Sequence, residues 1–261
     1  MNSADTAAPA LYELRGQVAI ITLNRPEKYN SLTPELLTLL EDFSRTAQSD
    51  PQVRAIVVTG AGEQAFCAGG DLGELIPQVI RSDKNIVVPD PSKRFFSDVF
   101  KPIIAAVNGA CIAGGFEIML GTDLRIAARE ATFGLGEVRW GVIPSAGTHV
   151  RLPRQIPWAV AMQLILTGRP VDADRAYAVG LVNEVVPRTD VLTRAIELAN
   201  EIAGNAPLAV TTAKEIAVRA LGLEAGFALE YALAERVKRS DDAREGPSAF
   251  IERRKPTWTG R

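Results

Sequence analysis

Two glycine-centred loops could direct backbone N–H groups at a single ligand oxygen. Residues 66–72 (FCAGGDL) and residues 108–117 (NGACIAGGFE) each follow an apolar run that is typical of a strand. Glycine lets the backbone come close to a ligand and adopt angles that other residues resist. We therefore predict a split oxyanion hole with the N–H groups of Gly70 and Gly114 as donors, each typically worth about 3 kcal/mol. The alternative is that these glycine pairs only turn the chain.

Two glutamates accompany the loops. Glu117 closes the second loop, and Glu137 ends the strand-like segment 133–137 (FGLGE). Addition of water across an α,β double bond needs one group that takes a proton from water and another that delivers a proton to the α-carbon. Two close, buried carboxylates meet this need, because like charges resist ionising together and the pKa of one rises. The set suggests enolate chemistry, although a solvent-facing Glu117 and an ion pair between Glu137 and Arg139 stay open.

Strand and helix patterns place these loops in a layered α/β core. Residues 11–15 and 17–24 indicate a hairpin about Gly16, and a helix is expected to begin at Pro34 with Thr33 as its N-cap. Strand, loop and helix then alternate, an order that favours an α/β fold. Further strands are expected at 53–59, 102–107, 124–127 and 131–134, with a helix starting near Gly114.

Helical periodicity dominates the chain after residue 146. Helices are expected at 159–166, 172–179, 192–203, 207–220, 224–239 and 248–254, with a strand-like linker at 182–187. Residues 80–93 lack periodicity and are expected to form a loop beside the site. We therefore divide the chain into a disordered tail at 1–10, an α/β core at 11–200 and a C-terminal helical region at 201–261.

Composition excludes several classes of function. Apolar residues make up 47% of the 261-residue chain and charged residues 23%, and the net charge is −2, so neither nucleic acid nor an anionic membrane is an expected partner. No apolar run approaches the roughly 18 residues of a membrane span. The two cysteines, Cys67 and Cys111, fit neither a metal-ligand spacing nor a disulfide framework. We expect them to be buried in a reduced, cytoplasmic protein without a bound metal.

Two other enzyme classes are poorly supported. Residues 60–65 (GAGEQA) match a permissive dinucleotide fingerprint, but such a motif must open a helix, and the residues that follow are poor helix formers. A serine hydrolase is disfavoured because Ser145 lacks the G-x-S-x-G elbow. His149 is the only histidine, and we expect it to be a packing or interface residue.

An ordered series of motifs carries a family resemblance. The motifs are ITLNRP at 21–26 with NSL at 30–32, FCAGGDL at 66–72, AAVNGACIAGGFE at 105–117, FGLGE at 133–137, and EG at 245–246 with AF at 249–250 and ERR at 252–254. With these motifs the chain closely resembles the crotonase superfamily, the enoyl-CoA hydratase/isomerase family, from about residue 11 to its end.

The resemblance implies a crotonase (ClpP/crotonase-like) fold, whose core is built of repeated ββα units. In members that hydrate enoyl-CoA, the oxyanion donors fall on positions matching Gly70 and Gly114, and the catalytic glutamates on those matching Glu117 and Glu137. Glu117 would activate water and Glu137 would deliver the α-proton. The resemblance implies no metal or redox cofactor, since coenzyme A is part of the substrate.

The resemblance also implies a CoA pocket and an assembly. The residues expected to contact CoA are Lys28, Ser31, Leu32, Ala68, Gly69, Asp71 and Leu72. The family implies homotrimers, often paired into hexamers, in which the C-terminal helices trimerise and partly cover a neighbouring site.

The chain departs from the family pattern at two places. Gly73 stands where hydratases commonly carry lysine, and Ser145 and Thr148 stand in a segment that is usually PGAGG. We expect these two side chains to take up space near the acyl group. Enoyl-CoA isomerisation, another crotonase-type reaction on acyl-CoA, and a non-catalytic acyl-CoA-binding protein remain as alternatives to a hydratase.

Overall fold

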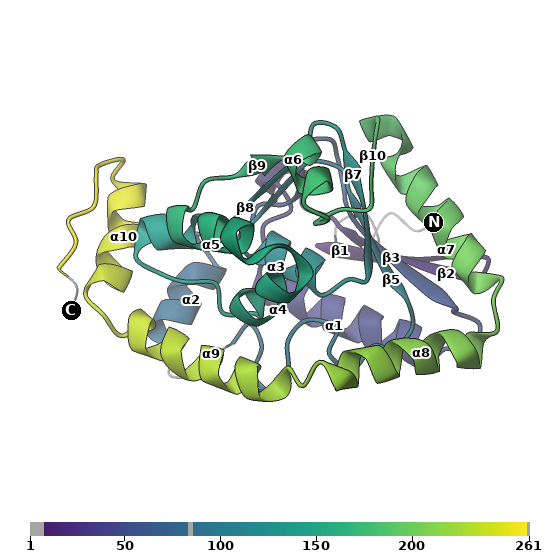
Figure 1. Ribbon diagram of the computed structural model, residues 1–261. Helices are drawn as coiled ribbons and strands as arrows, with labels where there is room; N and C mark the ends of the chain where they lie inside the picture. The colour runs from purple at the N-terminus through teal and green to yellow at the C-terminus, as the bar shows by residue number, and fades with distance from the viewer. Residues whose placement is uncertain (1–7, 83–85, 260–261) are drawn as a thin grey trace.

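A six-stranded sheet is the larger of two sheets in the described chain. The computed structural model describes residues 8–82 and 86–259 (Figure 1). The strands lie in the order β1 (Ala10–Arg15), β2 (Val18–Leu23), β3 (Ala55–Gly60), β5 (Ile103–Val107), β7 (Leu124–Ala128) and β10 (Glu184–Val186). The expected hairpin about Gly16 is confirmed, because β1 and β2 pair antiparallel. The other strands pair in parallel and confirm the α/β fold.

The N-terminal boundary differs slightly from the expected one. Ala10 is already a strand residue with a buried side chain, and Pro9 O accepts a hydrogen bond from Asn24 N. The expected tail at 1–10 is therefore too long at its end, and residues 1–7 lie outside the described part of the chain.

A second, smaller sheet gathers the chemistry-bearing loops. It contains β4 (Ala65–Cys67), β6 (Ala110–Ile112), β8 (Thr132–Gly134) and β9 (Val171–Asp172) in that order. The first three strands pair in parallel, so their carboxyl ends meet at one edge of the sheet. Both glycine loops and the segment with Glu137 leave the sheet at this edge.

Helices cover the sheets in the places that the apolar patterns indicate. Helix α1 (Pro34–Ser49) contacts β1 and β2, and it is capped as predicted by Thr33, whose Oγ1 accepts from Leu36 N. Helix α7 (Val191–Ala203) packs on β2, β3, β5 and β7. Helix α3 (Gly114–Leu120) starts where expected. It is almost entirely buried, because its residues are apolar all round apart from Glu117.

The C-terminal helices are partly as predicted. Their bounds are α4 (Thr148–Gln155), α5 (Trp158–Thr167), α6 (Ala173–Ala178), α8 (Pro207–Ala220), α9 (Glu224–Lys238) and α10 (Asp242–Ile251). Helix α4 was not predicted, and α10 begins six residues before the expected 248. Helices α8 and α9 run along one edge of the molecule, and α10 lies at its far end (Figure 1). No helix within residues 8–82 and 86–259 has the length and apolar character to cross a membrane.

The expected loop at 80–93 begins later than predicted. Helix α2 (Leu75–Arg81) includes its first two residues, and Lys84 and Asn85 lie outside the described residues. Between Asp90 and Phe100 the backbone forms turns rather than a regular element, as expected.

Helix α10 packs directly on the 3-10 helix η3 (Gly136–Trp140). A Cβ atom on Gly246 would lie 1.8 Å from Trp140 O, so only glycine permits this approach. The rings of Trp140 and Phe250 meet edge to face, with 4.6 Å between their centroids. The two elements are therefore fixed to each other by backbone contact and by an aromatic pair.

Candidate active site

The two glycine loops meet at the shared edge of the smaller sheet. A Cβ atom on Gly69 would lie 3.4 Å from Gly114 N, and one on Gly114 would lie 3.9 Å from Gly70 N. Gly69 has a φ of +97°, a conformation that favours glycine. Within the described chain, the N–H groups of Gly70 and Gly114 donate to no other protein group. The structure thus brings the two predicted donors together with free N–H groups.

Glu117 points from α3 into the protein, and only 6% of the residue is exposed. Its Oε1 accepts hydrogen bonds from Ala146 N at 2.7 Å and from Thr148 Oγ1 at 3.1 Å. Burial, together with the charges of Glu137 and Glu230, raises the pKa of Glu117 to about 8, although the two hydrogen bonds act in the opposite direction. The alternative of a solvent-facing Glu117 is therefore wrong.

Glu137 lies in η3, directly after β8, and not at a strand end as predicted. Its Oε2 is buried and has no hydrogen-bond partner. Among the described residues no ion pair joins it to Arg139, so that alternative is also wrong. Burial raises the pKa of Glu137 to about 7. Both carboxyl groups are thus held in surroundings that disfavour their charged forms.

One cavity of about 400 Å³ contains both glutamates and both glycines. Its other walls are mainly apolar and come from α2, η3, the segment after η3, α9 and α10. They include Leu72, Ile76, Val79, Ile80, Trp140, Val142, Ile143 and Phe250. The arrangement can hold an apolar group and an electron-rich oxygen, and it can move protons between a bound molecule and two carboxyl groups.

The residues expected to contact CoA fall into two groups. Leu32, Ala68 and Leu72 line the cavity. Gly69 holds the loop, since its carbonyl accepts from Leu32 N at 2.8 Å. Lys28 is exposed at the end of the 3-10 helix η2 (Pro26–Lys28) and is outside the cavity lining.

Ser31 and Asp71 also lie outside the lining, in a hydrogen-bonded network. Asp71 Oδ2 accepts from Arg25 Nη1 at 3.0 Å and from Ser31 Oγ at 3.1 Å. Asp71 Oδ1 accepts from Gly73 N at 2.9 Å. This network ties the chain before α1 to the first glycine loop, so these two side chains position the loop.

Sequence reasoning missed the residues that hold Glu117. We expected Ser145 and Thr148 to occupy space near the acyl group, and Ser145 does line the cavity. Thr148, in contrast, is fully buried with its hydroxyl on Glu117. The sequence offers no local signal for this contact, because it joins residues 31 positions apart on two helices, one of which was not predicted.

The remaining predictions for single residues can also be compared with the structure. Cys67 and Cys111 are buried, unpaired neighbours on β4 and β6, as expected. Residues 61–64 connect β3 to β4, and the segment 60–65 opens no helix, which agrees with the rejection of a dinucleotide site. His149 lies half-buried with Nδ1 3.2 Å from Glu230 Oε1.

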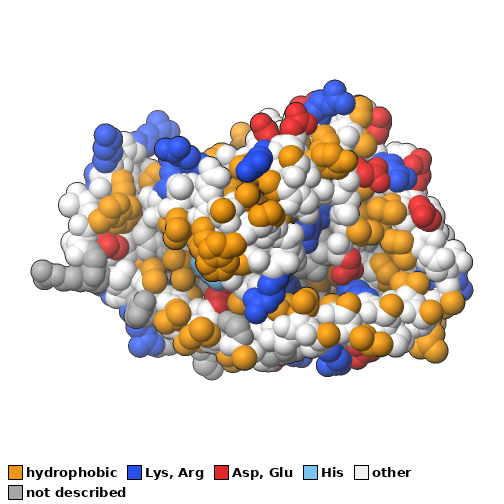
Figure 2. Space-filling model, viewed as in Figure 1, with side chains coloured by type: hydrophobic (Ala, Val, Ile, Leu, Met, Phe, Trp, Pro, Cys, Tyr) orange, Lys and Arg blue, Asp and Glu red, His pale blue; other side chains and the backbone are white. Residues whose placement is uncertain are grey.

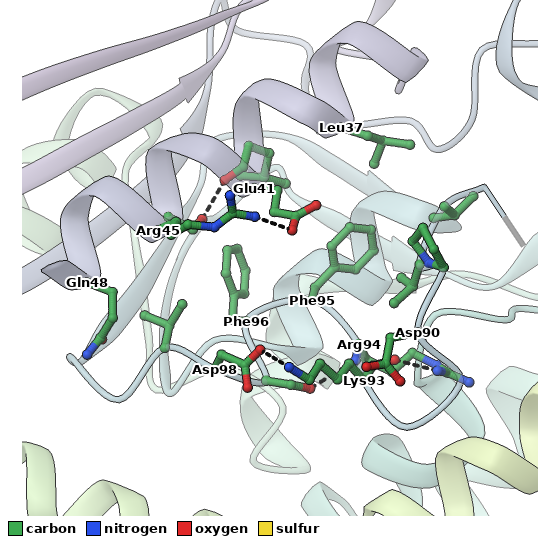
Figure 3. Close-up of a pocket in the computed structure, with 17 residues that line it drawn as sticks. Leu37, Glu41, Arg45, Gln48, Asp90, Lys93, Arg94, Phe95, Phe96 and Asp98 are labelled. Atoms are coloured by element: carbon green, nitrogen blue, oxygen red, sulfur yellow. Dashed lines mark hydrogen bonds and ion pairs between the residues drawn. The ribbon is translucent and has the colours of Figure 1, made fainter.

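A second cavity, of about 230 Å³, lies between α1 and residues 87–99. Phe95 and Phe96 extend toward α1 over its apolar floor (Figure 3). Two ion pairs lie among its lining residues: Lys93 Nζ lies 2.6 Å from Asp98 Oδ2, and an Arg45–Glu41 pair lies along α1. Neither the two predicted catalytic glutamates nor the two predicted oxyanion glycines line this cavity.

Comparisons with known proteins cover nearly the whole chain. The family model described as enoyl-CoA hydratase/isomerase matches residues 13–261. An enoyl-CoA hydratase of Mycobacterium tuberculosis, EchA19, is 38% identical over the full length of both chains. The (E)-benzylidenesuccinyl-CoA hydratase of Thauera aromatica is 38% identical, covering 97% of this chain and 99% of that protein.

Solved structures show the same likeness. The structure of EchA1_1 from Mycobacterium paratuberculosis is similar with a TM-score of 0.88 and 42% identity, covering 98% of this chain and all of that one. A carnitinyl-CoA dehydratase from Mycobacterium avium is similar with a TM-score of 0.86 and 41% identity, again over 98% and 100% of the two chains.

Proposed function

This chain belongs to the enoyl-CoA hydratase/isomerase family, and from that premise we propose that it catalyses the reversible addition of water to a trans-2-enoyl-CoA thioester. One observation carries the proposal. Two buried carboxyl groups with raised pKa values share a cavity with two free backbone N–H groups. A hydration needs a proton acceptor, a proton donor and a site for the developing enolate oxygen, and this cavity offers all three.

In the proposed mechanism, the thioester oxygen accepts hydrogen bonds from the N–H groups of Gly70 and Gly114. Glu117 takes a proton from water, and the hydroxyl bonds to the β-carbon while the electrons of the double bond move toward the thioester oxygen. Glu137 then gives its proton to the α-carbon, and the enolate returns to a thioester carbonyl. Dehydration follows the reverse path.

The hydrogen bonds support this division of roles. Glu117 Oε1 accepts two of them, and hydrogen bonds to a carboxylate favour its charged, proton-accepting form. Glu137 Oε2 accepts none and is buried, which disfavours its charged form. The pKa of Glu117 is nevertheless raised further than that of Glu137, because Glu117 is buried beside the charges of Glu137 and Glu230, so the division of roles rests on the hydrogen bonds and not on the order of the two pKa values. Because the two carboxyl groups also repel as charges, the pair is best described as sharing one proton near neutral pH.

We further propose that coenzyme A enters as part of the substrate along the first glycine loop. Leu32, Ala68 and Leu72 line that side of the cavity, and Gly69, Ser31 and Asp71 hold the loop in place. The exposed Lys28 side chain lies at the end of η2, next in the chain to this group, and is available to a phosphate. The apolar walls favour an apolar acyl group. The proposed steps use only carboxyl groups and backbone donors, and they require no metal or redox cofactor.

The exposed apolar side chains on α8 and α9 support self-association as a homotrimer or hexamer. Leu208 and Ile216 on α8, and Leu229 and Leu233 on α9, are exposed, and Figure 2 shows hydrophobic side chains along this edge of the molecule. Light scattering of the purified protein measures the assembly directly. The two unpaired cysteines are in keeping with a cytoplasmic location.

The test of the function is a panel of short, long, branched and aromatic trans-2-enoyl-CoA thioesters. Loss of the conjugated enoyl absorbance with a product heavier by one water supports the hydratase and identifies its acyl preference. A shifted double bond without a change of mass would instead indicate isomerisation, for which one glutamate and the oxyanion donors suffice. Binding of acyl-CoA without turnover would indicate a binding protein. The Glu137→Gln variant serves as the inactive control.

A further inference from the structure

A third buried glutamate, Glu230, lies across residues 146–149 from Glu117. Glu230, on α9, has a side chain that is only 2% exposed. Its Oε2 accepts from Arg94 Nε at 3.1 Å and from Gly147 N at 2.9 Å, and its Oε1 accepts from His149 N at 2.9 Å. All of these donors lie far from Glu230 in the sequence. Through Gly147 N and His149 N, Glu230 links α9 to the start of α4.

Four consecutive residues alternate between this glutamate and Glu117. Ala146 N and Thr148 Oγ1 donate to Glu117, whereas Gly147 N and His149 N donate to Glu230. The segment is therefore held between two buried carboxyl groups. Its conformation depends on Gly147, whose φ is +111° and whose added Cβ atom would lie 3.0 Å from Arg94 Cγ.

Because of this alternation, the hydrogen bonds to Glu117 depend on those to Glu230. A shift of the segment toward either carboxyl group would stretch the bonds to the other. We propose that Glu230 is a positioning residue for the reaction, which fixes residues 146–149 so that Ala146 N–H and the Thr148 hydroxyl stay on Glu117. The proposal rests on the proposed function, in which Glu117 accepts the proton of water.

Glu230 also stabilises the fold, and a test must separate the two roles. Arg94 is fully buried, donates from Nη2 to Phe227 O at 2.7 Å, and would lose its only ion-pair partner among the described residues. Loss of Glu230 therefore lowers stability whether or not the residue positions Glu117. Melting temperature alone does not test the proposal.

The test is a double-mutant cycle with Glu230→Gln and Thr148→Val. Glutamine keeps the shape of Glu230, but only one of its two terminal atoms can accept hydrogen bonds. Valine at position 148 removes the hydroxyl that donates to Glu117. For groups in one hydrogen-bond network we expect coupling. Glu230→Gln should lower kcat about tenfold with little change in KM, and the double variant should be hardly worse than the worse single variant.

The control is Glu215→Gln, which removes a carboxylate from an exposed pair with Arg219 on α8 and should leave kcat and KM unchanged. The positioning role would be overturned if the fold-losses in kcat of the two single variants multiplied in the double variant. It would also be overturned if Glu230→Gln raised KM and left kcat unchanged. If Glu230→Gln does not fold, Glu230→Asp takes its place in the cycle, since it keeps the charge and withdraws the oxygens by one methylene.

A titration distinguishes failure of this inference from failure of the proposed function. The charged groups that face Glu117 are Glu137 from η3, Glu230 from α9 and Arg151 from α4. Carbon-13 NMR of labelled glutamate carboxyl groups, assigned with Glu117→Gln, follows Glu117 without any substrate. Thr148→Val should raise the pKa of Glu117 in the parent chain and raise it less in Glu230→Gln. An equal rise in both backgrounds would contradict the inference even for a chain that hydrates no enoyl-CoA.

Discussion

Two cavities of this protein differ in the charged residues that distinguish them. In the larger one, Glu137 has a buried oxygen without a partner, and Glu117 is buried near the charges of Glu137 and Glu230. In the smaller one, Lys93 and Asp98 are 46% and 69% exposed and form an ion pair in contact with water (Figure 3). Both cavities have apolar floors, so the contrast lies in the state of the charges.

The difference between buried, unpaired carboxyl groups and an exposed ion pair distinguishes a cavity suited to catalysis from a gap between packed elements. An exposed ion pair is solvated on most sides and contributes less than about 1 kcal/mol. A buried carboxyl group without a partner has a raised pKa and destabilises the fold, so its presence is informative about chemistry. The volume of a cavity does not show whether it takes part in a reaction, because an apolar cavity of either size need not bind any specific ligand.

Removing the carboxyl groups of the larger cavity should give the largest effect. Glu117→Gln or Glu137→Gln is expected to lower kcat for hydration by about 10³-fold, because each substitution removes a proton-transfer group and keeps its size. Steady-state kinetics measures the loss, and acyl-CoA affinity should stay close to that of the parent chain. Near-normal hydration by both variants would rule out the proposed mechanism.

The oxyanion donors can be tested with a matched pair of substitutions at Gly114. Gly114→Pro removes the N–H at the first position of α3, where proline is tolerated, and should lower kcat by about 10²-fold. Gly114→Ala keeps the N–H, and its Cβ would come too close only to the end of the Leu32 side chain, at 2.8 Å, with Gly69 Cα and Gly70 N at ordinary contact distances, so its loss should be smaller. Equal losses in two folded variants would mean that the N–H is not a donor to the substrate.

The pH dependence should report the raised pKa values. Below about pH 7 the pair of glutamates takes up a second proton and loses its base, and above about pH 8 it loses its remaining proton and thus its acid. We therefore expect kcat/KM to fall about tenfold per pH unit on either side of a maximum at pH 7 to 8. An acid limb near 4.5, the ordinary pKa of glutamate, would contradict the burial of both groups.

The smaller cavity should respond least. Lys93→Met and Asp98→Asn each break the exposed pair and are expected to leave kcat and KM unchanged, with a change in the free energy of unfolding below about 0.5 kcal/mol. Enzyme assays and denaturant unfolding measure the two quantities. A large loss of activity in either variant would show that this cavity takes part in the reaction. The inference that only the larger cavity does so would then be wrong.

Local signals explain why much of the fold was predictable. The Thr33–Pro34 pair marks a helix start, Gly16 separates two strand-like runs, and both predictions are confirmed. The glycine loops and the family resemblance pointed to four residues that share one cavity, because the segments that carry them follow three parallel strands of the smaller sheet and leave it at one edge.

What the sequence did not reveal depends on distant contacts. Helix α10 contains Gly246 and Pro247, which locally disfavour a helix, but the glycine is required by the backbone of Trp140. Helix α4 starts after Gly147 and includes Pro153, so it lacks an uninterrupted apolar pattern. The hydrogen bonds to Glu230 span about 80 residues, and no short-range pattern encodes them.

Because α10 packs on η3, the larger cavity is completed by the last helix of the chain to be synthesised. Ala243, Pro247 and Phe250 form part of the wall around Glu137, yet α10 follows every other element of the larger cavity along the chain. A nascent chain on the ribosome therefore holds both carboxyl groups before it holds the α10 side of their cavity. We therefore expect the cavity to close, and activity to begin, only after α10 has been translated and has packed on η3.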